Sequence, residues 1–220
     1  MIEYFINHVR RFKLNNINSL YFYIANVYNL YLYLNCMENT HILGFGGSLR
    51  RQSYNTYLLK ACTELMPDGS ELEIADISNL PFFNQDMENN YPENVKNFKN
   101  KIKNADGILI VTPEYNYSVP GFLKNAIDLA SRPYGDNSFD GKPVAIMSAS
   151  IGMIGGARAQ YHLRQSCVFL NMIPVNKPEV MVPFAQQKFD ENGKLNDETA
   201  IKFMRELLQN LVDLSRQLKK

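Results

Sequence analysis

The sequence predicts an α/β fold, in which a parallel β-sheet carries helices on both faces. The first observation is that short apolar strands alternate with helical segments from residue 41 onward. The second is that the strands 107–112 and 144–147 are runs of β-branched and other apolar residues, typical of strands buried on both faces. Strands and helices that alternate in this way form βαβ units, whose strands run parallel.

The first half of this alternation predicts two strands and two helices. Residues 41–47 form a short apolar strand that runs into glycines, and 53–66 is a helix with apolar residues at helical spacing. Residues 72–75 alternate between polar and apolar, as a strand does. Residues 93–104 are a polar helix with one apolar stripe, which we expect to face the sheet.

The second half predicts three strands and three helices. The strands are expected at 107–112, 144–147 and 175–182, and the helices at 121–131, 156–171 and 200–218. Pro120 precedes the first of these helices, where its missing amide hydrogen costs no helical bond. The sequence therefore predicts five strands separated by helices, in one sheet.

Composition narrows the class of protein. The chain has 220 residues, of which 45% are hydrophobic, and a formal net charge of +1, which gives no general attraction to nucleic acid. Cys36, Cys62 and Cys167 are widely spaced and form neither a metal-binding motif nor a disulfide framework. We expect no metal, no nucleic-acid partner and a reducing, cytoplasmic location, with Cys62 and Cys167 packed as free thiols.

Residues 1–36 differ from the rest of the chain. They hold six of the 13 tyrosines and no glycine or proline, and no charge lies between Lys13 and Glu38. Basic residues before an apolar stretch are typical of a signal or anchor, but asparagines interrupt this one and it is short for a span of about 20 residues. Three explanations stay open: Met37 is the true start, the segment associates with a membrane, or it adds a structural element. We expect an atypical extension at 1–36 and the folded domain at 37–220.

Ligands of parallel α/β sheets bind at the carboxyl ends of the strands. The loop 47–55, after the first strand, brings serine hydroxyls, the Asn55 amide and the Arg50 charge to a helix N-terminus, which favours an anion. It lacks the Gly-Lys-Ser/Thr of a Walker loop, and Leu49 stands where a dinucleotide fingerprint has its third glycine. A single phosphate is the expected guest, and an ordinary serine-capped helix is the alternative.

The loop 112–121, after the third strand, is stiffened by Pro113 and Pro120. We expect the backbone amides of residues 114–116 to bond the polar edge of a flat ring, and the tyrosines at 115 and 117 to offer stacking faces. The alternative is a rigid strand-to-helix connection. We do not expect Glu114 to act as a general base, because no histidine or second acid accompanies it in the sequence.

The loop 148–157, after the fourth strand, is rich in small residues that let a ligand approach the backbone. Arg158 follows in the first turn of a helix, where its charge opposes the helix dipole. We expect a compensating partner outside that helix, either a cofactor phosphate or another subunit. His162 is expected to be a packed or surface histidine.

These three loops resemble those of the NADPH-dependent FMN reductase family, and most closely its chromate and quinone reductase branch. The matching stretches are 47–55, 112–128 and 155–164, and the likeness covers about residues 40–218. The resemblance implies a flavodoxin-like three-layer sandwich with a five-stranded parallel sheet in the order 2-1-3-4-5. It also implies non-covalent FMN and a homodimer or homotetramer. The candidate partners of Arg158 are then a carboxylate of another subunit, such as Glu179, and the 2′-phosphate of NADPH.

The resemblance further implies which residues bind the cofactor, with the phosphate on the first loop, the isoalloxazine ring on the second and additional contacts on the third. These residues are Ser48, Leu49, Arg50, Ser53, Tyr54, Asn55, Pro113, Glu114, Tyr115, Asn116, Ser148, Ala149 and Ser150. Ala149 stands where related sequences are expected to carry a hydroxyl, so we expect a backbone contact there.

The implied activity is NAD(P)H-dependent reduction of small acceptors: quinones, azo or nitro compounds, chromate or free flavin. NADPH or NADH reduces the flavin and the acceptor then oxidises it at the same face, so no catalytic side chain is expected. Two alternatives stay open, a flavodoxin-type electron carrier and a flavin-binding or flavin-free interaction protein without turnover. The chain lacks the hydroxyl-rich Thr-x-Thr-Gly loop usual in such carriers.

Overall fold

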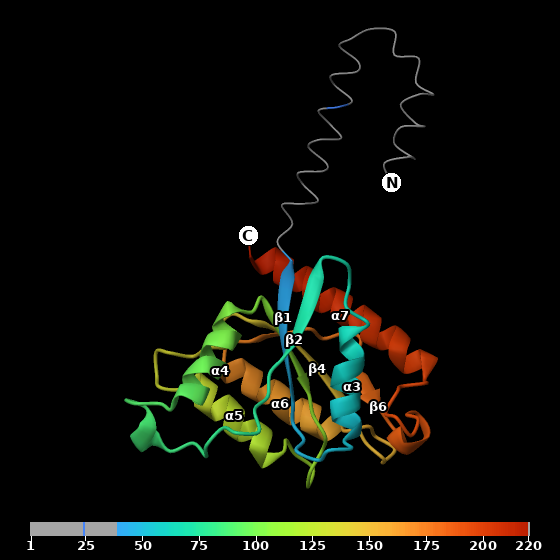
Figure 1. The fold of residues 1–220 in the computed structure, drawn as a ribbon, viewed down its shortest axis with the longest axis horizontal. Helices are drawn as coiled ribbons and strands as arrows, with labels where there is room; N and C mark the ends of the chain where they lie inside the picture. Colours follow the sequence, from blue (N-terminus) through green and yellow to red (C-terminus); the bar gives the residue numbers. More distant parts are fainter. Residues whose placement is uncertain (1–23, 25–38, 220) are drawn as a thin grey trace. The chain divides into compact units, whose positions relative to one another are not determined.

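The computed structural model describes Ile24 and residues 39–219 (Figure 1). Apart from Ile24, the predicted extension at 1–36 and its boundary lie outside the described residues. Among the described helices, none combines the length and the hydropathy that crossing a membrane requires.

Strands and helices alternate along the described chain, as the sequence predicts. The strands are β1 Thr40–Gly46, β2 Ser70–Ile74, β3 Gly107–Val111, β4 Pro143–Ala149, β5 Ile173–Pro174 and β6 Val180–Val182. The α-helices are α3 Tyr54–Thr63, α4 Glu93–Asn104, α5 Gly121–Ser131, α6 Ala157–Phe169 and α7 Glu198–Leu218. Two short 3-10 helices are η1 Gln85–Met87 and η2 Ala185–Gln187.

The sheet is parallel and has the strand order β2-β1-β3-β4-β5, which confirms the predicted order. The single strand predicted at 175–182 is wrong in one respect. Within it only Val180–Val182 is a strand, β6, while β5 lies just before it at Ile173–Pro174, and both pair with β4. The backbone leaves the sheet between them, where Pro178 has no amide hydrogen to give to a ladder.

Helices cover both faces of the sheet and give the molecule three layers (Figure 1). On one face, α3 and α7 bury residues such as Leu58 and Leu208 against the strands. On the other face, α4, α5 and α6 bury residues such as Phe98, Ile127 and Leu163. Because β3 lies between these layers, all five of its residues are buried, as its apolar sequence predicts.

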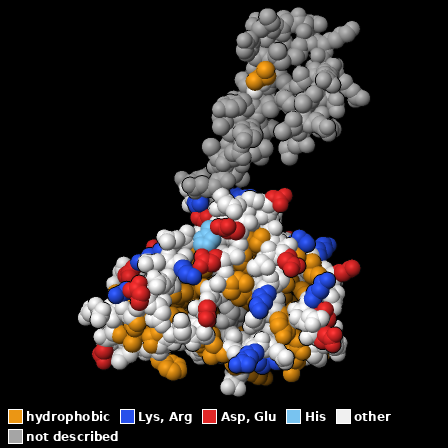
Figure 2. Space-filling model, viewed as in Figure 1, with side chains coloured by type: hydrophobic (Ala, Val, Ile, Leu, Met, Phe, Trp, Pro, Cys, Tyr) orange, Lys and Arg blue, Asp and Glu red, His pale blue; other side chains and the backbone are white. Residues whose placement is uncertain are grey.

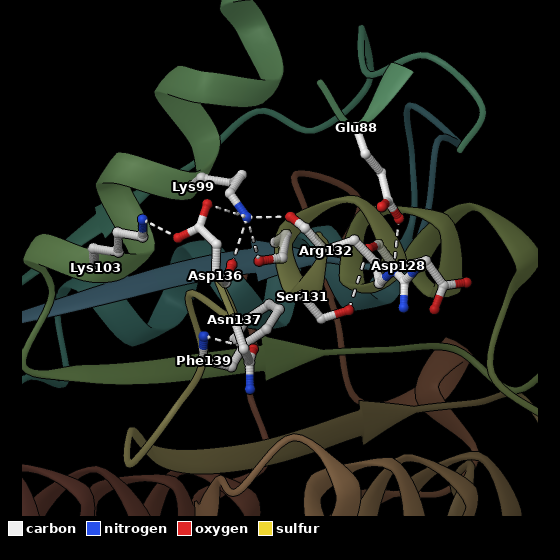
Figure 3. A network of polar contacts seen from close by, with 10 residues as sticks. Glu88, Lys99, Lys103, Asp128, Ser131, Arg132, Asp136, Asn137 and Phe139 are labelled. Carbon is white, nitrogen blue, oxygen red and sulfur yellow. Dashed lines mark hydrogen bonds and ion pairs between the residues drawn. The ribbon is translucent and has the colours of Figure 1, made fainter. Parts of the chain in front are cut away.

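A polar network fixes the loop that leads from α5 to β4 (Figure 3). Lys99 of α4 is 4% exposed, and its Nζ donates to the carbonyl oxygens of Ala130, Arg132 and Asp136. Burial lowers the pKa of this lysine. The same loop contains Asn137, whose side chain bonds Phe139 and Leu170. These contacts lie before β4 begins, at the amino ends of the strands.

Charged side chains of both signs are interspersed on the surface seen in Figure 2, with apolar side chains between them. This agrees with the formal net charge of +1. The visible face therefore has no single-sign surface that would attract a polyanion.

Candidate active site

Three loops that the sequence singles out lie at the carboxyl ends of β1, β3 and β4, at the lower edge of Figure 1. Two pairs of side-chain contacts join them. Asn55, in the first turn of α3, bonds the backbone of Ala149 at the end of β4. Glu114, in the loop after β3, bonds Arg158 at the start of α6. The structure therefore brings the three predicted loops together at one edge of the sheet.

The first loop begins with a close approach of two chain segments. A Cβ added at Gly47 would lie 2.9 Å from Thr112 Oγ1 and 3.0 Å from Leu123 Cδ2. Glycine thus lets the loop after β1 lie against the loop after β3. Ser53, which is 2% exposed, is the N-cap of α3, and its Oγ accepts a bond from the Asn55 amide at 3.3 Å.

The polar side chains before α3 are placed around its N-terminus. The Ser48 hydroxyl accepts a bond from the Arg50 amide at 3.3 Å. The Arg50 guanidinium lies 5.5 Å from the centre of the Tyr54 ring, and the Leu49 side chain is exposed. A helix N-terminus with hydroxyls and a guanidinium beside it has the donor set that a phosphate group takes.

Asn55 is held differently from the expectation of an open phosphate contact. It is 3% exposed, its Nδ2 donates to the Ala149 carbonyl at 2.8 Å, and its Oδ1 accepts from the Ala149 amide at 2.8 Å. The same two bonds occupy the Ala149 backbone groups that were expected to contact the cofactor.

The second loop contains a tight turn at 115–118. Tyr115 and Ser118 exchange two backbone bonds of 3.1 and 3.0 Å, and Asn116 and Tyr117 between them have positive φ values of 51° and 67°. The Tyr115 amide, one of three expected to face a ring, is therefore used within the turn. The Tyr115 and Tyr117 side chains are 50% and 65% exposed, which leaves aromatic faces open at this edge.

The Glu114 carboxylate compensates the positive charge of Arg158. Its Oε2 accepts from the amides of Arg158 at 3.0 Å and Ala159 at 3.4 Å, and its Oε1 lies 3.0 Å from Arg158 Nη1. The Arg158 guanidinium also lies 3.8 Å from the centre of the Tyr117 ring. Within the described chain, Arg158 thus has a carboxylate partner that was not among the candidates expected, and Glu179 accepts from Tyr161. The Glu114 carboxylate offsets the positive charge of Arg158 near the helix N-terminus. It also accepts hydrogen bonds from the first amides of α6, which have no acceptor within the helix.

Hydrogen bonds of buried polar side chains hold the third loop in place. The Ser148 hydroxyl donates to the Gly155 carbonyl at 2.6 Å and accepts from Gln160 Nε2 at 2.7 Å, and both side chains belong to fully buried residues. Gly156 has a φ of 92°, and a Cβ there would lie 2.8 Å from Ser148 Cβ. Ser150 Oγ accepts from the Gly152 amide at 3.1 Å. Within the described chain, the Ser148 hydroxyl therefore supports the loop.

Gln160 is a residue of this site that the sequence reading missed. It lies on the buried side of α6 together with Leu163 and Cys167, at the spacing of one helical stripe. The sequence signal was a polar residue within an apolar helical stripe. It indicates a buried amide, which needs hydrogen-bond partners in the fold. His162 is exposed, as expected, with its Nδ1 2.9 Å from Ser118 Oγ.

The geometry suits a ligand with one phosphate and a flat ring. Hydroxyls and a guanidinium lie at the N-terminus of α3, while the loop after β3 carries the exposed Tyr115 and Tyr117. Glu114 is fully engaged in capping α6, so it is not placed as a free acid or base. The edge can hold and orient a redox-active ring, and the ring then supplies the redox chemistry itself.

A three-layer sandwich whose parallel sheet has this strand order defines a flavodoxin-like fold. The chain belongs to the NADPH-dependent FMN reductase family, whose model matches residues 40–187. This confirms the family predicted from the three loops.

Curated and solved relatives agree with this assignment. An NAD(P)H-dependent FMN reductase of Pseudomonas aeruginosa is 49% identical over 175 residues, which cover 79% of this chain and 94% of the relative. An NAD(P)H:quinone oxidoreductase of Solanum tuberosum is 48% identical over 185 residues, covering 81% and 94%. The structure of FerB, a flavoenzyme NAD(P)H:(acceptor) oxidoreductase of Paracoccus denitrificans, has a TM-score of 0.75 at 35% identity and covers 81% of this chain and 98% of FerB.

The chain is therefore an oxidoreductase that uses FMN as its cofactor and NAD(P)H as its reductant. This confirms the predicted class of enzyme and the predicted cofactors.

Proposed function

We propose that this enzyme reduces quinones at the carboxyl edge of its sheet, with other small acceptors, such as azo and nitro compounds, chromate and free flavin, as further substrates. The observation that carries the proposal is the joining of the three loops around the N-terminus of α3 by Asn55–Ala149 and Glu114–Arg158. The name of the potato relative, a quinone oxidoreductase, supports quinones as the acceptor class.

The phosphate of FMN is held by the first loop in this proposal. Ser48, Arg50 and Ser53 supply the hydroxyls and the charge, next to the backbone of Leu49 and Tyr54. The support is the placement of these groups at the N-terminus of α3, where helical amides lack helical acceptors.

The flavin ring lies against the loops after β3 and β4 in this proposal, near Pro113–Asn116 and Ser148–Ser150. When bound, FMN supplies two-electron chemistry, accepting hydride equivalents from a nicotinamide and passing electrons to an acceptor. The chain's own task is to bind and orient, with the rigid 115–118 turn on one side and the glycine-rich loop on the other. An open edge with exposed Tyr115 and Tyr117 supports the view that nicotinamide and acceptor use one face in turn.

A homodimer or homotetramer is the assembly that we propose. The support is the α5–α6 face, where Val168 and Phe169 are 83% and 78% exposed beside a groove of about 430 Å³ that Ile127 and Leu170 help to line. Exposed apolar patches of this kind mark association surfaces. Sedimentation of a Val168→Asp variant should show a smaller species than the wild type, and unchanged sedimentation would contradict this interface.

We propose that residues 37–220 suffice for the activity and that the protein works in the cytoplasm. Every proposed contact lies after Gly46, and the described cysteines, Cys62 and Cys167, are free and buried. Burial raises the pKa of these thiols to about 12 and about 11, so they are inert in the folded protein. A chain that begins at Met37 should keep its flavin and its NADPH oxidation, and loss of either would show that 1–36 belongs to the fold.

A steady-state panel of acceptors tests the proposed activity. The purified protein should release FMN and no FAD on denaturation, and should oxidise NADPH or NADH with quinones faster than with chromate or azo dyes. NAD(P)H oxidation with no acceptor preference would leave quinones unsupported. A flavin-loaded protein that oxidises neither nucleotide would instead fit an electron carrier or an interaction protein.

A further inference from the structure

The ladder between β3 and β4 ends in an unusual way. The Thr112 amide donates to the Met147 carbonyl at 2.9 Å, as a regular parallel ladder requires. In a ladder that continued, the Ala149 amide would next donate to Thr112, and the Ala149 carbonyl would accept from the Glu114 amide. Both Ala149 groups bond the Asn55 side chain instead, each at 2.8 Å.

Asn55 therefore takes the place of a neighbouring strand. One edge of a carboxamide presents an N–H donor beside the C=O acceptor, so it completes the two missing bonds. Asn55 and Ala149 are 3% and 2% exposed, and an unpaired backbone group at such depth is costly. On its other side β4 continues to pair, because the Ser150 amide donates to the Val182 carbonyl at 3.0 Å.

The consequence is a defined separation between two loops of the site. Past Thr112, the chain after β3 leaves β4, and the Asn55 amide occupies the position that this chain would have taken. The loop that begins at Pro113 and the loop that begins at Ser150 thus separate at this point. The Asn55 side chain, which comes from the first turn of α3, lies between them. One residue of the first loop fixes how far apart the other two lie.

We propose that Asn55 is a positioning residue of the flavin site, which sets the spacing of the loops after β3 and β4 and does not itself ligate the phosphate. The inference deepens the proposed function and rests on it, since it concerns the same site. It predicts that removing the amide weakens every ligand that needs both loops, whether or not the ligand carries a phosphate.

The test uses the full chain with Asn55→Ala, and FMN and riboflavin as probes. Loss of one to two hydrogen bonds should raise the dissociation constants of both flavins by the same factor, roughly tenfold. Arg50→Ala should instead weaken FMN and leave riboflavin unchanged, because riboflavin has no phosphate. In the flavin-free protein, hydrogen exchange at the Ala149 amide should accelerate by about tenfold or more in Asn55→Ala.

A matched control comes from the other end of the sheet. Asn137 uses the same two groups, with Oδ1 accepting from the Phe139 amide at 3.0 Å (Figure 3). Its Nδ2 donates to the Leu170 carbonyl at 2.8 Å. Asn137→Ala should lower the melting temperature but leave both flavin dissociation constants unchanged. This separates positioning of the site from a general loss of stability.

Two results would overturn the proposal. One is a loss of FMN affinity in Asn55→Ala with riboflavin unaffected, which would make Asn55 a phosphate ligand. The other is unchanged exchange at Ala149. If Asn55→Ala does not fold, Asn55→Asp keeps the acceptor for the Ala149 amide and loses the donor, and the same measurements apply. A wild-type chain that binds no flavin would refute the proposed function, while the exchange measurement would still decide the role of Asn55.

Discussion

At the scale of single residues, the two arginines of the site differ in their partners. Arg158 has the Glu114 carboxylate at 3.0 Å and the Tyr117 ring at 3.8 Å. Arg50 contacts the Tyr54 ring, and no carboxylate of the described chain lies within ion-pair distance of it. Arg50 lies beside a helix N-terminus and has no carboxylate partner in the described chain, so it is the arginine that we expect to bind an anion.

Arg50→Ala should therefore weaken FMN binding with little change in the fold. A charge-assisted contact to phosphate contributes about 1.5–3 kcal/mol, which corresponds to about 10- to 150-fold in affinity. Fluorescence titration of the flavin-free protein measures the dissociation constant. The adjacent Arg51 is exposed and is the matched control. Equal affinities for Arg50→Ala and the wild type would show that Arg50 does not reach the phosphate.

Glu114 and Arg158 should be energetically coupled. Because they are in contact, the effects of Glu114→Gln and Arg158→Ala on the free energy of unfolding should not add, with a coupling of about 0.5–1 kcal/mol. The Arg158 side chain is 41% exposed, so the coupling should fall as salt is raised. Urea unfolding of the two single variants and the double variant measures it. Additive effects at low salt would contradict the assignment of Glu114 as the partner of Arg158.

At the scale of elements, α7 depends on a cap that also forms an ion pair. Asp197 Oδ1 accepts from the Ala200 amide at 2.7 Å, and its Oδ2 lies 2.8 Å from Lys188 Nζ. The hydrogen bond from Lys188, together with the backbone bond from Ala200, lowers the pKa of the Asp197 carboxyl. A carboxyl with a lowered folded pKa stabilises the protein above its unfolded pKa, and this stability is lost as the pH falls through the folded value.

Asp197→Ala should lower the free energy of unfolding by about 1 kcal/mol near neutral pH, the usual effect of losing an N-cap. The difference from wild type should shrink as the pH falls below about 4 and through the lowered folded pKa. Urea unfolding across this pH range measures it. Asp213→Ala, on the same helix but away from its N-terminus, is the control. A difference that stays constant to the lowest pH would mean that the ionised carboxylate is not the cap.

Most helices and strands could be predicted because the apolar residues in each recur at one clear spacing, that of a helix or that of a strand. The helices at 93–104 and 121–131 agree with α4 and α5 at both ends, and the β-branched run at 107–112 matches β3 within one residue. The presence of two short strands, β5 at 173–174 and β6 at 180–182, instead of one strand at 175–182 could not be read in this way, because both pieces are extended and apolar. Pairing partners, which distinguish one strand from two, are tertiary information.

The loops of the site could be located from the sequence, but the partners of their side chains could not. Arg158 was correctly expected to need compensation, yet its partner lies 44 residues away in the chain. Asn55 was placed in the right loop, yet it bonds a residue 94 positions away. Such bonds depend on how far β3 and β4 extend beside one another, which no local pattern records.

At the scale of the whole molecule, the two ends of the sheet have different tasks. The amino end is closed by contacts such as those of Lys99, which is nearly fully buried, donates to three backbone carbonyls and pairs with the Asp136 carboxylate (Figure 3). The carboxyl end has exposed tyrosines. Its loops are held by the buried side chains of Asn55 and Gln160. A rigid scaffold that presents one open edge suits a cofactor whose ring must meet two substrates.

An anaerobic titration of the purified protein with NADPH, followed by a quinone, tests the central claim most directly. If FMN lies at the open carboxyl edge and serves nicotinamide and acceptor in turn, stoichiometric NADPH should bleach the visible flavin absorption. Stoichiometric quinone should then restore it. A flavin spectrum that NADPH leaves unchanged, or a reduced protein that the quinone does not reoxidise, would contradict this role of the FMN.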